Sequence, residues 1–424
     1  MRILFEKTEV LGYGQKYLAV DGNTITYIGD ERPEGDFDRV IDTKNKLVCP
    51  ALYNCHTHSP MQFLRGYGED LPLDRWLHER IFPAEDRLTA DIVYTTSSFA
   101  IAEMIKNGIC SFSDMYYFCD MTAKAVGESG IKANISRSIV SFDDTADHKN
   151  DGRFLESVKL YNDYNNAFDG RLKVDFSLHA EYTNVESMAR FCADYARDKG
   201  IAFQIHLSET EKEHRECIER HGKTPTRFFE DTGILDSKVS FAHCVWVTDE
   251  DMDILKKRGA TVVHNPASNL KLGSGIMPLS KMLEKGINVA LGTDSSASNN
   301  TLDILKEIYL AAILQKGYDR DPSSVKAETI LKLATENGAV SQSREKSGSL
   351  AVGNRADIIM IDLDKINNIP MFSPVYTLVY SANSSDVCFN MVDGRILYEN
   401  GEYKTLDIER VKYNMKELIG SFFA

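Results

Sequence analysis

Six of the ten histidines and one aspartate fall at or beside the ends of short apolar runs. These residues are His56, His58, His179, His206, His243, His264 and Asp294. Neutral imidazole nitrogens and a carboxylate oxygen suit zinc, and bound zinc lowers the pKa of a water molecule to about 7. If the ends of these runs meet on one face of the fold, the residues can hold a metal ion that makes water a nucleophile at neutral pH.

His56 and His58 lie two residues apart in the stretch "LYNCHTHSPM". Successive side chains of a strand point to opposite faces, so this pair points the same way and can share one ion. A single histidine such as His206 or His243 would by itself be read as a hydrogen-bonded core residue, and Asp294 as a helix cap. The coincidence at several strand ends is what favours a metal site.

Glu209 follows His206 by three residues. One interpretation is a solvated loop acid. The other is a proton shuttle aimed over the metal from the turn after the strand, which its place beside a ligand favours.

The elements that must position these residues begin near residue 47. Eight apolar runs alternate with stretches of helical periodicity, such as 91–107 and 249–259. The runs are "LVCPALYN", "ICSFSDMY", "KANISRSIV", "LKVDFSLHA", "AFQIHLSE", "VSFAHCVW", "ATVVHNP" and "INVALGTD". This pattern predicts an α/β fold, a (β/α)₈ barrel whose strand ends carry the chemistry on one face. A doubly wound sheet is the alternative, but its glycine-rich first turn is missing.

Both ends of the chain have the character of β-structure. Residues 1–48 alternate short strand-like bursts with Gly and Asp turns, and strand-like text returns after residue 347. We therefore expect residues 1–48 and 347–424 to pair into one small β-sandwich, and residues 49–346 to form the barrel.

The composition is that of a soluble globular protein. Of 424 residues, 43% are hydrophobic, and the net charge of -14 disfavours nucleic acids and anionic membranes as partners. No stretch approaches the roughly 20 apolar residues of a membrane span, and the first residues lack an apolar signal core. The sequence predicts a cytoplasmic protein with a small-molecule substrate.

Five segments in fixed order resemble the amidohydrolase superfamily. They are "HTH", "HLSETEKEH", "AHCVW", "HNPASNLKLGSGI" and "LGTDSSASNN". More narrowly they are similar to the 5-methylthioadenosine/S-adenosylhomocysteine deaminases, whose relatives include triazine chlorohydrolases and guanine deaminases. The segment "GSLAVGNRADIIMIDLD" looks like this family's return into its composite β-sandwich.

The resemblance implies one divalent metal, zinc first and iron second, with four ligands from this chain: His56, His58, His206 and Asp294. It also implies that His243 holds the attacking water. Superfamily members with two metals carry a lysine at the end of the fourth strand. Here that strand ends "FSLHA", which favours a single metal.

The implied reaction is hydrolytic deamination of an adenine ring at C6, a hydrolase reaction on a cyclic amidine C–N bond. The implied substrates are S-adenosylhomocysteine, 5'-methylthioadenosine or adenosine, and the products are the inosyl analogue and ammonia. Glu209 would protonate a ring nitrogen while Asp294 accepts a proton from the attacking water. Deaminases of unrelated folds use the same pairing of a metal with a glutamate that is not a ligand.

The resemblance also implies which residues bind the substrate. Trp76 would pack on it, Glu85 would accept hydrogen bonds from the ribose, and His179 would contact the purine. The further implied residues are Arg137 and Arg153, for the homocysteine carboxylate, and Ser298, for the purine pocket. Ala51 and Ser295 stand where the family usually has glycine, and this bears on the shape of the eighth loop.

Two other functions stay open at this point. One is a single-metal enzyme acting on another heterocycle, such as guanine or a triazine. The other is a barrel scaffold without catalysis, although such proteins usually lose ligands and none is missing here. The resemblance further implies a homo-oligomer.

Overall fold

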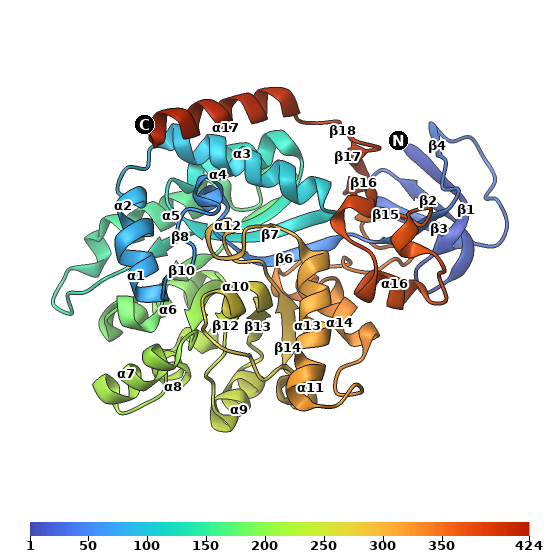
Figure 1. The fold of residues 1–424 in the computed structure, drawn as a ribbon. Helices are drawn as coiled ribbons and strands as arrows, with labels where there is room; N and C mark the ends of the chain where they lie inside the picture. The colour runs from blue at the N-terminus through green and yellow to red at the C-terminus, as the bar shows by residue number, and fades with distance from the viewer. Residues whose placement is uncertain (424) are drawn as a thin grey trace.

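The computed structural model describes residues 1–423, apart from the side chains of Leu73 and Asp74. Its centre is a nearly closed barrel of parallel strands (Figure 1). In spatial order it runs from β14 back to β6, and β9 and β10 together fill the fourth position. The strands are β6 (Leu52–Thr57), β7 (Ile109–Tyr116), β8 (Lys132–Ile139), β9 (Leu172–Val174), β10 (Phe176–Leu178), β11 (Phe203–Leu207), β12 (Val239–His243), β13 (Thr261–His264) and β14 (Asn288–Leu291). The predicted (β/α)₈ barrel is confirmed.

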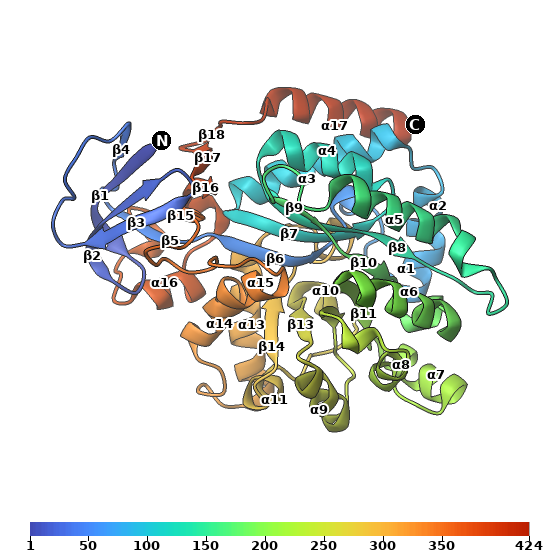
Figure 2. The same ribbon diagram turned by 180° about the vertical axis from the view of Figure 1, so that it is seen from behind.

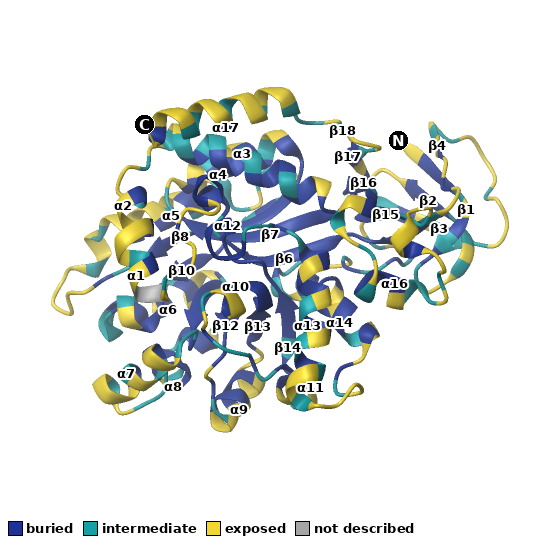
Figure 3. Ribbon diagram, in the orientation of Figure 1, coloured by how far each residue is buried: buried dark blue, intermediate teal, exposed yellow. Residues whose placement is uncertain are grey.

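Helices surround the barrel on the outside, as the views from the front and from behind show (Figures 1 and 2). The helices between and after the strands are α3 (Ala90–Lys106), α4 (Cys119–Ser129), α5 (Gly152–Tyr164), α6 (Glu186–Lys199), α7 (Glu211–His221), α8 (Pro225–Asp231), α9 (Asp249–Arg258), α10 (Pro266–Lys271), α11 (Leu279–Glu284), α12 (Ser296–Asn299), α13 (Ile304–Asp319), α14 (Ala327–Leu333) and α15 (Glu336–Ser341). Their buried faces point inward and their exposed faces outward (Figure 3).

The sequence sets the ends of these helices by local chemistry, as α9 illustrates. Thr248 and Asp251 form a capping box, in which each side chain accepts a hydrogen bond from the other residue's backbone N–H. Acidic residues fill its first turn and basic residues its last, which complements the helix dipole. Gly259 then ends the helix with a φ of 67°, a conformation that glycine adopts without strain.

The barrel strands are almost entirely buried. All eight residues of β7 and all five of β11 are buried, because the strands face packed side chains inside the barrel and helices outside it. Burial on both faces explains why nearly every residue of these runs is apolar, and why the few polar residues within them are informative.

The two ends of the chain share a second sheet, separate from the barrel. Its order is β18-β17-β16-β15-β5-β1-β2-β3, with β4 beside β1. The members are β1 (Arg2–Val10), β2 (Gly14–Asp21), β3 (Thr24–Gly29), β4 (Arg39–Ile41), β5 (Lys46–Pro50), β15 (Ile358–Asp362), β16 (Val387–Val392), β17 (Arg395–Glu399) and β18 (Glu402–Tyr403). The antiparallel pair of β5 and β15 joins the two ends.

The predicted run "LVCPALYN" forms two strands instead of one, since β5 belongs to this sheet and β6 to the barrel. The domain boundaries at 48 and 347 stay a prediction.

A buried ionic cluster ties this sheet to the barrel. The Nζ atom of Lys132, on β8, lies 2.7 Å from both carboxylate oxygens of Asp357 and 2.9 Å from Asp393. Lys132 and Asp357 are buried, and Asp393 is half-buried. Removing this cation takes away the ion-pair partner of the buried Asp357, whereas Asp393 keeps Arg355, whose Nη1 lies 3.8 Å from its carboxylate.

Replacing Lys132 by methionine is expected to destabilise the protein by about 3–5 kcal/mol, the usual effect of orphaning a buried charge. Urea unfolding followed by circular dichroism would measure it. Lys159→Met is the control, because its partner Asp163 forms an exposed pair that contributes about 1 kcal/mol or less. Equal unfolding midpoints for the two variants would contradict the role of the cluster.

The C-terminal helix α17 (Ile408–Phe422) lies across the barrel rather than on the terminal sheet (Figure 1). It packs along α3, and its last turn contacts the segment before α3. The guanidinium of Arg87 lies 4.0 Å from the centre of the Phe422 ring and donates a hydrogen bond to the Phe422 carbonyl. Phe63 meets the same ring edge-on, at 5.0 Å between centroids.

A short helix, α16 (Pro374–Tyr380), packs against α13 and α14. Among the described residues, no helix is long and apolar enough to cross a membrane.

Candidate active site

Four side chains meet at the C-terminal ends of strands on opposite sides of the barrel. His56 lies on β6, His58 one residue beyond it, His206 on β11, and Asp294 three residues after β14. Asp294 Oδ1 lies 3.6 Å from His56 Nε2 and 3.3 Å from His58 Nε2. His206 Nε2 lies 3.3 Å from His58 Nε2. These distances place three nitrogens and one carboxylate oxygen around a common point.

The donor set fits a divalent metal ion. His56 Nε2 is buried with no hydrogen-bond partner, which is costly unless another ligand occupies that direction. Three imidazoles with one carboxylate leave a position open for water, as catalytic zinc sites do. Among the described residues, two groups come close enough to share one ion: His56 with His58 and His206, and His56 with His243 and Asp294. The side chains gathered here could thus hold a divalent metal.

Backbone carbonyls fix the orientation of two of these rings. His58 Nδ1 lies 2.7 Å from the Met115 carbonyl, and His206 Nδ1 lies 2.7 Å from the His179 carbonyl. A carbonyl can only accept, so each Nδ1 carries the proton and each Nε2 presents its lone pair to the site. Such outer hydrogen bonds hold metal ligands in place.

Asp114, on β7, supports the backbone that carries His56 and His58 through hydrogen bonds to the residues beside them. Its carboxylate accepts hydrogen bonds from Thr57 Oγ1 at 2.8 Å, and from the backbone N–H and Oγ of Ser59 at 2.5 and 3.0 Å. Sequence reasoning missed Asp114. The signal was present, because an aspartate inside the apolar run "ICSFSDMY" needs buried partners just as the histidines do.

Glu209 and His243 face each other beside the metal site. Glu209 Oε2 lies 3.9 Å from His243 Nε2, and Ser274 Oγ donates to Glu209 Oε1 at 3.3 Å. Burial raises the pKa of Glu209 above its usual value, which favours the protonated form. Burial lowers the pKa of His243, but the charges of Glu209 and Asp294 more than offset this, so its pKa lies above the usual value.

A second carboxylate, Glu213, positions the turn that carries Glu209. It accepts hydrogen bonds from the backbone N–H of Ser208 at 2.9 Å and of Glu209 at 2.8 Å. This holds Ser208 at a φ of 46°, a strained conformation for a residue with a side chain. Thr210 caps α7, which begins here and brings Glu213 back toward the strand end. The sequence contains Glu213, but it does not reveal that α7 brings this side chain back to the end of β11.

The predicted residue Ser298 contacts Asp294 and does not line the cavity. Its Oγ donates to Asp294 Oδ2 at 2.7 Å, and Ser268 Oγ donates to the same oxygen at 2.6 Å. Both hydroxyls therefore leave Oδ1 free for the metal site. Ser295 caps α12 with a φ of -76°, so its replacement of the family's usual glycine causes no strain.

A cavity opens above these side chains and is lined by several predicted substrate residues. Trp76, Glu85, His179 and Glu209 line it, together with His58, His206, His243 and Asp294. Trp76 ends α1 (Leu73–Trp76), a π-helical turn follows at Leu77–Ile81, and Glu85 ends α2 (Phe82–Glu85). The Tyr116 hydroxyl donates to Glu85 at 2.7 Å, and burial raises the pKa of Glu85 to about 7.

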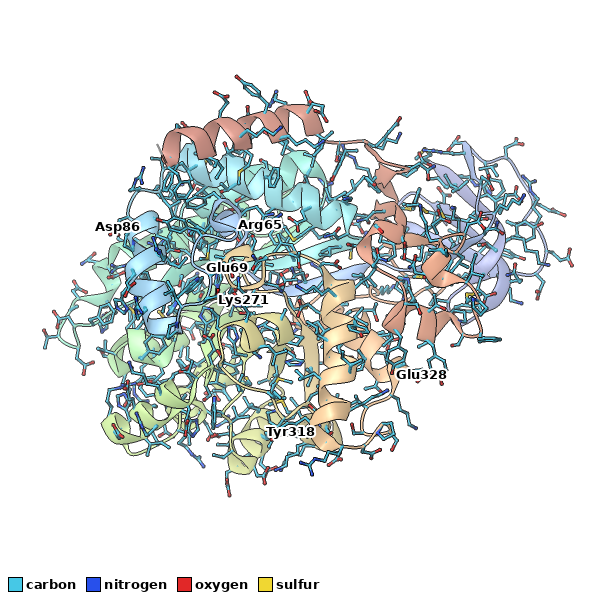
Figure 4. All side chains as sticks on the ribbon, in the orientation of Figure 1. Arg65, Glu69, Asp86, Lys271, Tyr318 and Glu328 are labelled. Carbon is cyan, nitrogen blue, oxygen red and sulfur yellow. The ribbon has the colours of Figure 1, made fainter. Side chains whose placement is uncertain are left out.

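An ion pair ties the rim of this cavity together. The Nζ of Lys271, on α10, lies 2.9 Å from the carboxylate of Glu69, which also accepts from Asn300 Nδ2 at 2.9 Å. Figure 4 shows Glu69 and Lys271 close to each other. The contact fastens the loop before α1 to the loops that follow β13 and β14.

The two predicted arginines lie outside the cavity. Arg137 pairs with Glu156, Nε to Oε2 at 2.5 Å. Arg153 has 46% of its side chain exposed, and its Nη1 lies 3.8 Å from Asp151. The structure thus gathers the predicted proton-transfer residues, with Trp76, Glu85 and His179, around one cavity that His58, His206 and Asp294 also line. His56 contacts Asp294 without lining the cavity, and Arg137, Arg153 and Ser298 do not line it either.

A parallel barrel with histidines and an aspartate converging at the ends of its strands defines a metal-dependent barrel protein. Residues 47–397 match the model of the amidohydrolase family, and the chain belongs to this family.

Curated relatives and solved structures agree with this assignment. The chain is 43% identical, over 94% of its length and 92% of the relative, to the 5-methylthioadenosine/S-adenosylhomocysteine deaminase of Thermoanaerobacter pseudethanolicus. It is 42% identical, over 93% and 90%, to the 5'-deoxyadenosine deaminase of Methanosarcina acetivorans. The structure of an adenosine deaminase from Xanthomonas campestris with bound zinc superimposes with a TM-score of 0.94 at 27% identity, covering 99% of this chain and 98% of that one.

Proposed function

We propose that this chain is a metal-dependent hydrolase that converts an adenosine derivative and water into the inosyl analogue and ammonia. The observation that carries the proposal is the carboxylate of Glu209, which is only 12% exposed, is not among the proposed ligands and lies 3.9 Å from His243 beside the metal site. Deamination needs both an activated water and an acid that protonates the ring. The names of the relatives, deaminases of adenosine derivatives, support the same reaction.

We propose zinc as the metal, held by His56, His58, His206 and Asp294. The zinc in the structure of the Xanthomonas campestris protein supports this choice, and iron is the second candidate. A bound divalent ion of this kind lowers the pKa of water to about 7 and so supplies a nucleophile at neutral pH.

Three residues of the chain move or hold protons in this scheme. Glu209, whose pKa burial raises, gives its proton to the ring nitrogen next to C6 as water adds to C6. Asp294 accepts the proton of the attacking water, and His243 hydrogen-bonds that water through Nε2. The C6–N bond then breaks, and the amino group leaves as ammonia after taking up the proton from Asp294. The remaining hydroxyl proton passes to Glu209 as the C6 carbonyl forms, which restores the protonated glutamate.

Other cavity residues position the nucleoside. Trp76 packs on the substrate, His179 contacts the purine, and Glu85 accepts hydrogen bonds from the ribose hydroxyls. Glu85 lies on α2 and lines the same cavity as the residues at the strand ends, so a nucleoside whose C6 faces the metal site can direct its ribose toward Glu85. Ser298 affects purine binding only indirectly, through its hydrogen bond to Asp294. The homo-oligomer stays a prediction.

An ammonia-release assay with zinc-loaded protein tests this function. Adenosine, 5'-methylthioadenosine, 5'-deoxyadenosine and S-adenosylhomocysteine form the panel, with guanine and a chlorotriazine as the alternatives. Release of ammonia from at least one adenosine derivative, and none from guanine, is expected. Turnover of guanine or the triazine alone would overturn the proposal, and the absence of any turnover would favour a scaffold.

A further inference from the structure

Glu307, on α13, is a fully buried carboxylate that the proposed reaction does not use. Burial raises its pKa to about 7, although hydrogen bonds from Ala267 and Asn299 favour the charged form. Taking a carboxylate out of water costs free energy unless its hydrogen bonds compensate for the loss. The partners of Glu307 therefore indicate which part of the structure it stabilises.

The two oxygens of Glu307 join two short helices at the C-terminal ends of the barrel strands. Oε2 accepts a hydrogen bond from the backbone N–H of Ala267 at 3.0 Å, in the first turn of α10. Oε1 accepts from Asn299 Nδ2 at 2.8 Å, at the end of α12. Helix α10 packs against both α12 and α13 (Figure 1). Because α10 follows β13 and α12 follows β14, one carboxylate fastens the seventh loop of the barrel to the eighth.

Each of the two helices directs one hydroxyl at Asp294 from the residue next to its contact with Glu307. Ser268 donates to Asp294 Oδ2 at 2.6 Å, and Ser298 donates to the same oxygen at 2.7 Å. Both serines are buried. Two donors on Oδ2 oppose rotation of the carboxylate, so Oδ1 stays turned toward the histidines of the metal site.

A second link between α10 and α12 lies at the rim of the cavity. Lys271 Nζ donates to the Ala297 carbonyl at 3.1 Å and pairs with Glu69, and the two charged side chains are 25% and 38% exposed. Ion pairs that water reaches contribute little to stability, whereas hydrogen bonds to a charged group are among the stronger ones. We therefore expect the buried link through Glu307 to fix the two serines.

We propose that Glu307 is a positioning residue for Asp294, because it holds α10 and α12 at the spacing that lets Ser268 and Ser298 orient the Asp294 carboxylate. The inference rests on the proposed function, in which Asp294 is a metal ligand and accepts a proton from the attacking water. Glu307 itself touches neither metal nor substrate. Outer hydrogen-bond partners of this kind typically change metal affinity or activity by about 10- to 100-fold.

Replacing Glu307 by glutamine tests the inference, since glutamine has the same shape but only one oxygen to accept the two hydrogen bonds. Zinc affinity, measured by competition with a chromogenic chelator, is expected to fall by about tenfold. The kcat for the best adenosine derivative should also fall by about tenfold. KM should stay unchanged, because Glu307 does not line the cavity.

A cycle of variants separates this role from a general loss of packing. In a protein that carries Ser268→Ala and Ser298→Ala, Glu307→Gln should change zinc affinity and kcat by less than about twofold, because the hydroxyls through which it acts are gone. A residue that only packs the helices would cause the same loss with and without the two serines.

Gln315→Met is the matched control. Gln315 is a buried polar residue of the same helix, about two turns beyond Glu307. Its Nε2 donates to Ser280 Oγ at 3.1 Å and to Asp319 Oδ1 at 2.8 Å, so its contacts lie with α11 and the end of α13. This variant should keep the zinc affinity and kcat of the natural protein.

Unchanged zinc affinity and kcat in Glu307→Gln, or equal losses in the two backgrounds, would overturn the inference. If no adenosine derivative is turned over, but zinc affinity falls only in the protein with both serines, the proposed function fails and the positioning of Asp294 stands. If Glu307→Gln does not fold, Glu307→Asp takes its place in the cycle, since it keeps the charge and draws the carboxylate back by one methylene group.

Discussion

Replacing Glu209 by glutamine is expected to lower kcat by about 10²- to 10⁴-fold while the protein keeps its metal. The substitution preserves size and the hydrogen bond from Ser274, but an amide cannot deliver a proton to the ring nitrogen. Ammonia release and metal analysis of the same preparation would measure both quantities.

Glu211→Gln is the control for this variant. Glu211 is an exposed residue of the first turn of α7, two positions away from Glu209, and should retain full activity. If Glu209→Gln kept more than about a tenth of the activity, Glu209 would not be a general acid by the usual size of that effect.

Removing the metal is the second change with a large expected effect. Dialysis against a chelator should lower ammonia release by about a hundredfold or more, since a Lewis acid contributes several kcal/mol to such reactions. Zinc should restore it. The thermal unfolding midpoint should also fall, because a ligand bound only to the folded state stabilises it.

A pair of variants separates ligands from neighbouring histidines. His206→Asn should lose bound metal, whereas His264→Asn should retain it, although both residues are buried at strand ends. His264 belongs to neither group of possible ligands found among the described residues. Equal metal content in the two variants would contradict the assigned ligand set.

The barrel and its metal site were predictable from the sequence because both depend on local patterns. Polar residues within buried runs are rare, and parallel strands bring their ends to one face. The position of His56, His58, His206 and Asp294 therefore followed from their place in the runs. The runs predict only that seven polar residues converge on one face, and the resemblance is what selects four of them as metal ligands.

The partners of these residues were not predictable in the same way. Asp114, Ser274 and Asn269 contact the site from remote parts of the chain, and only the closed barrel brings them there. The direction of Arg137 depends on strand register, since a shift of one residue would turn it into the barrel. Ser298 lies in the expected loop, but its hydroxyl reaches Asp294 instead of the cavity.

The last helix has a consequence for the order in which the protein acquires its parts during synthesis. Trp76 and Ile81 belong to the same hydrophobic cluster as Met415 and Phe422 of α17. On the ribosome, the segment that carries Trp76 emerges more than three hundred residues before its support. The barrel strands can pair earlier, but the walls that receive a nucleoside take their final form only after α17 has left the exit tunnel.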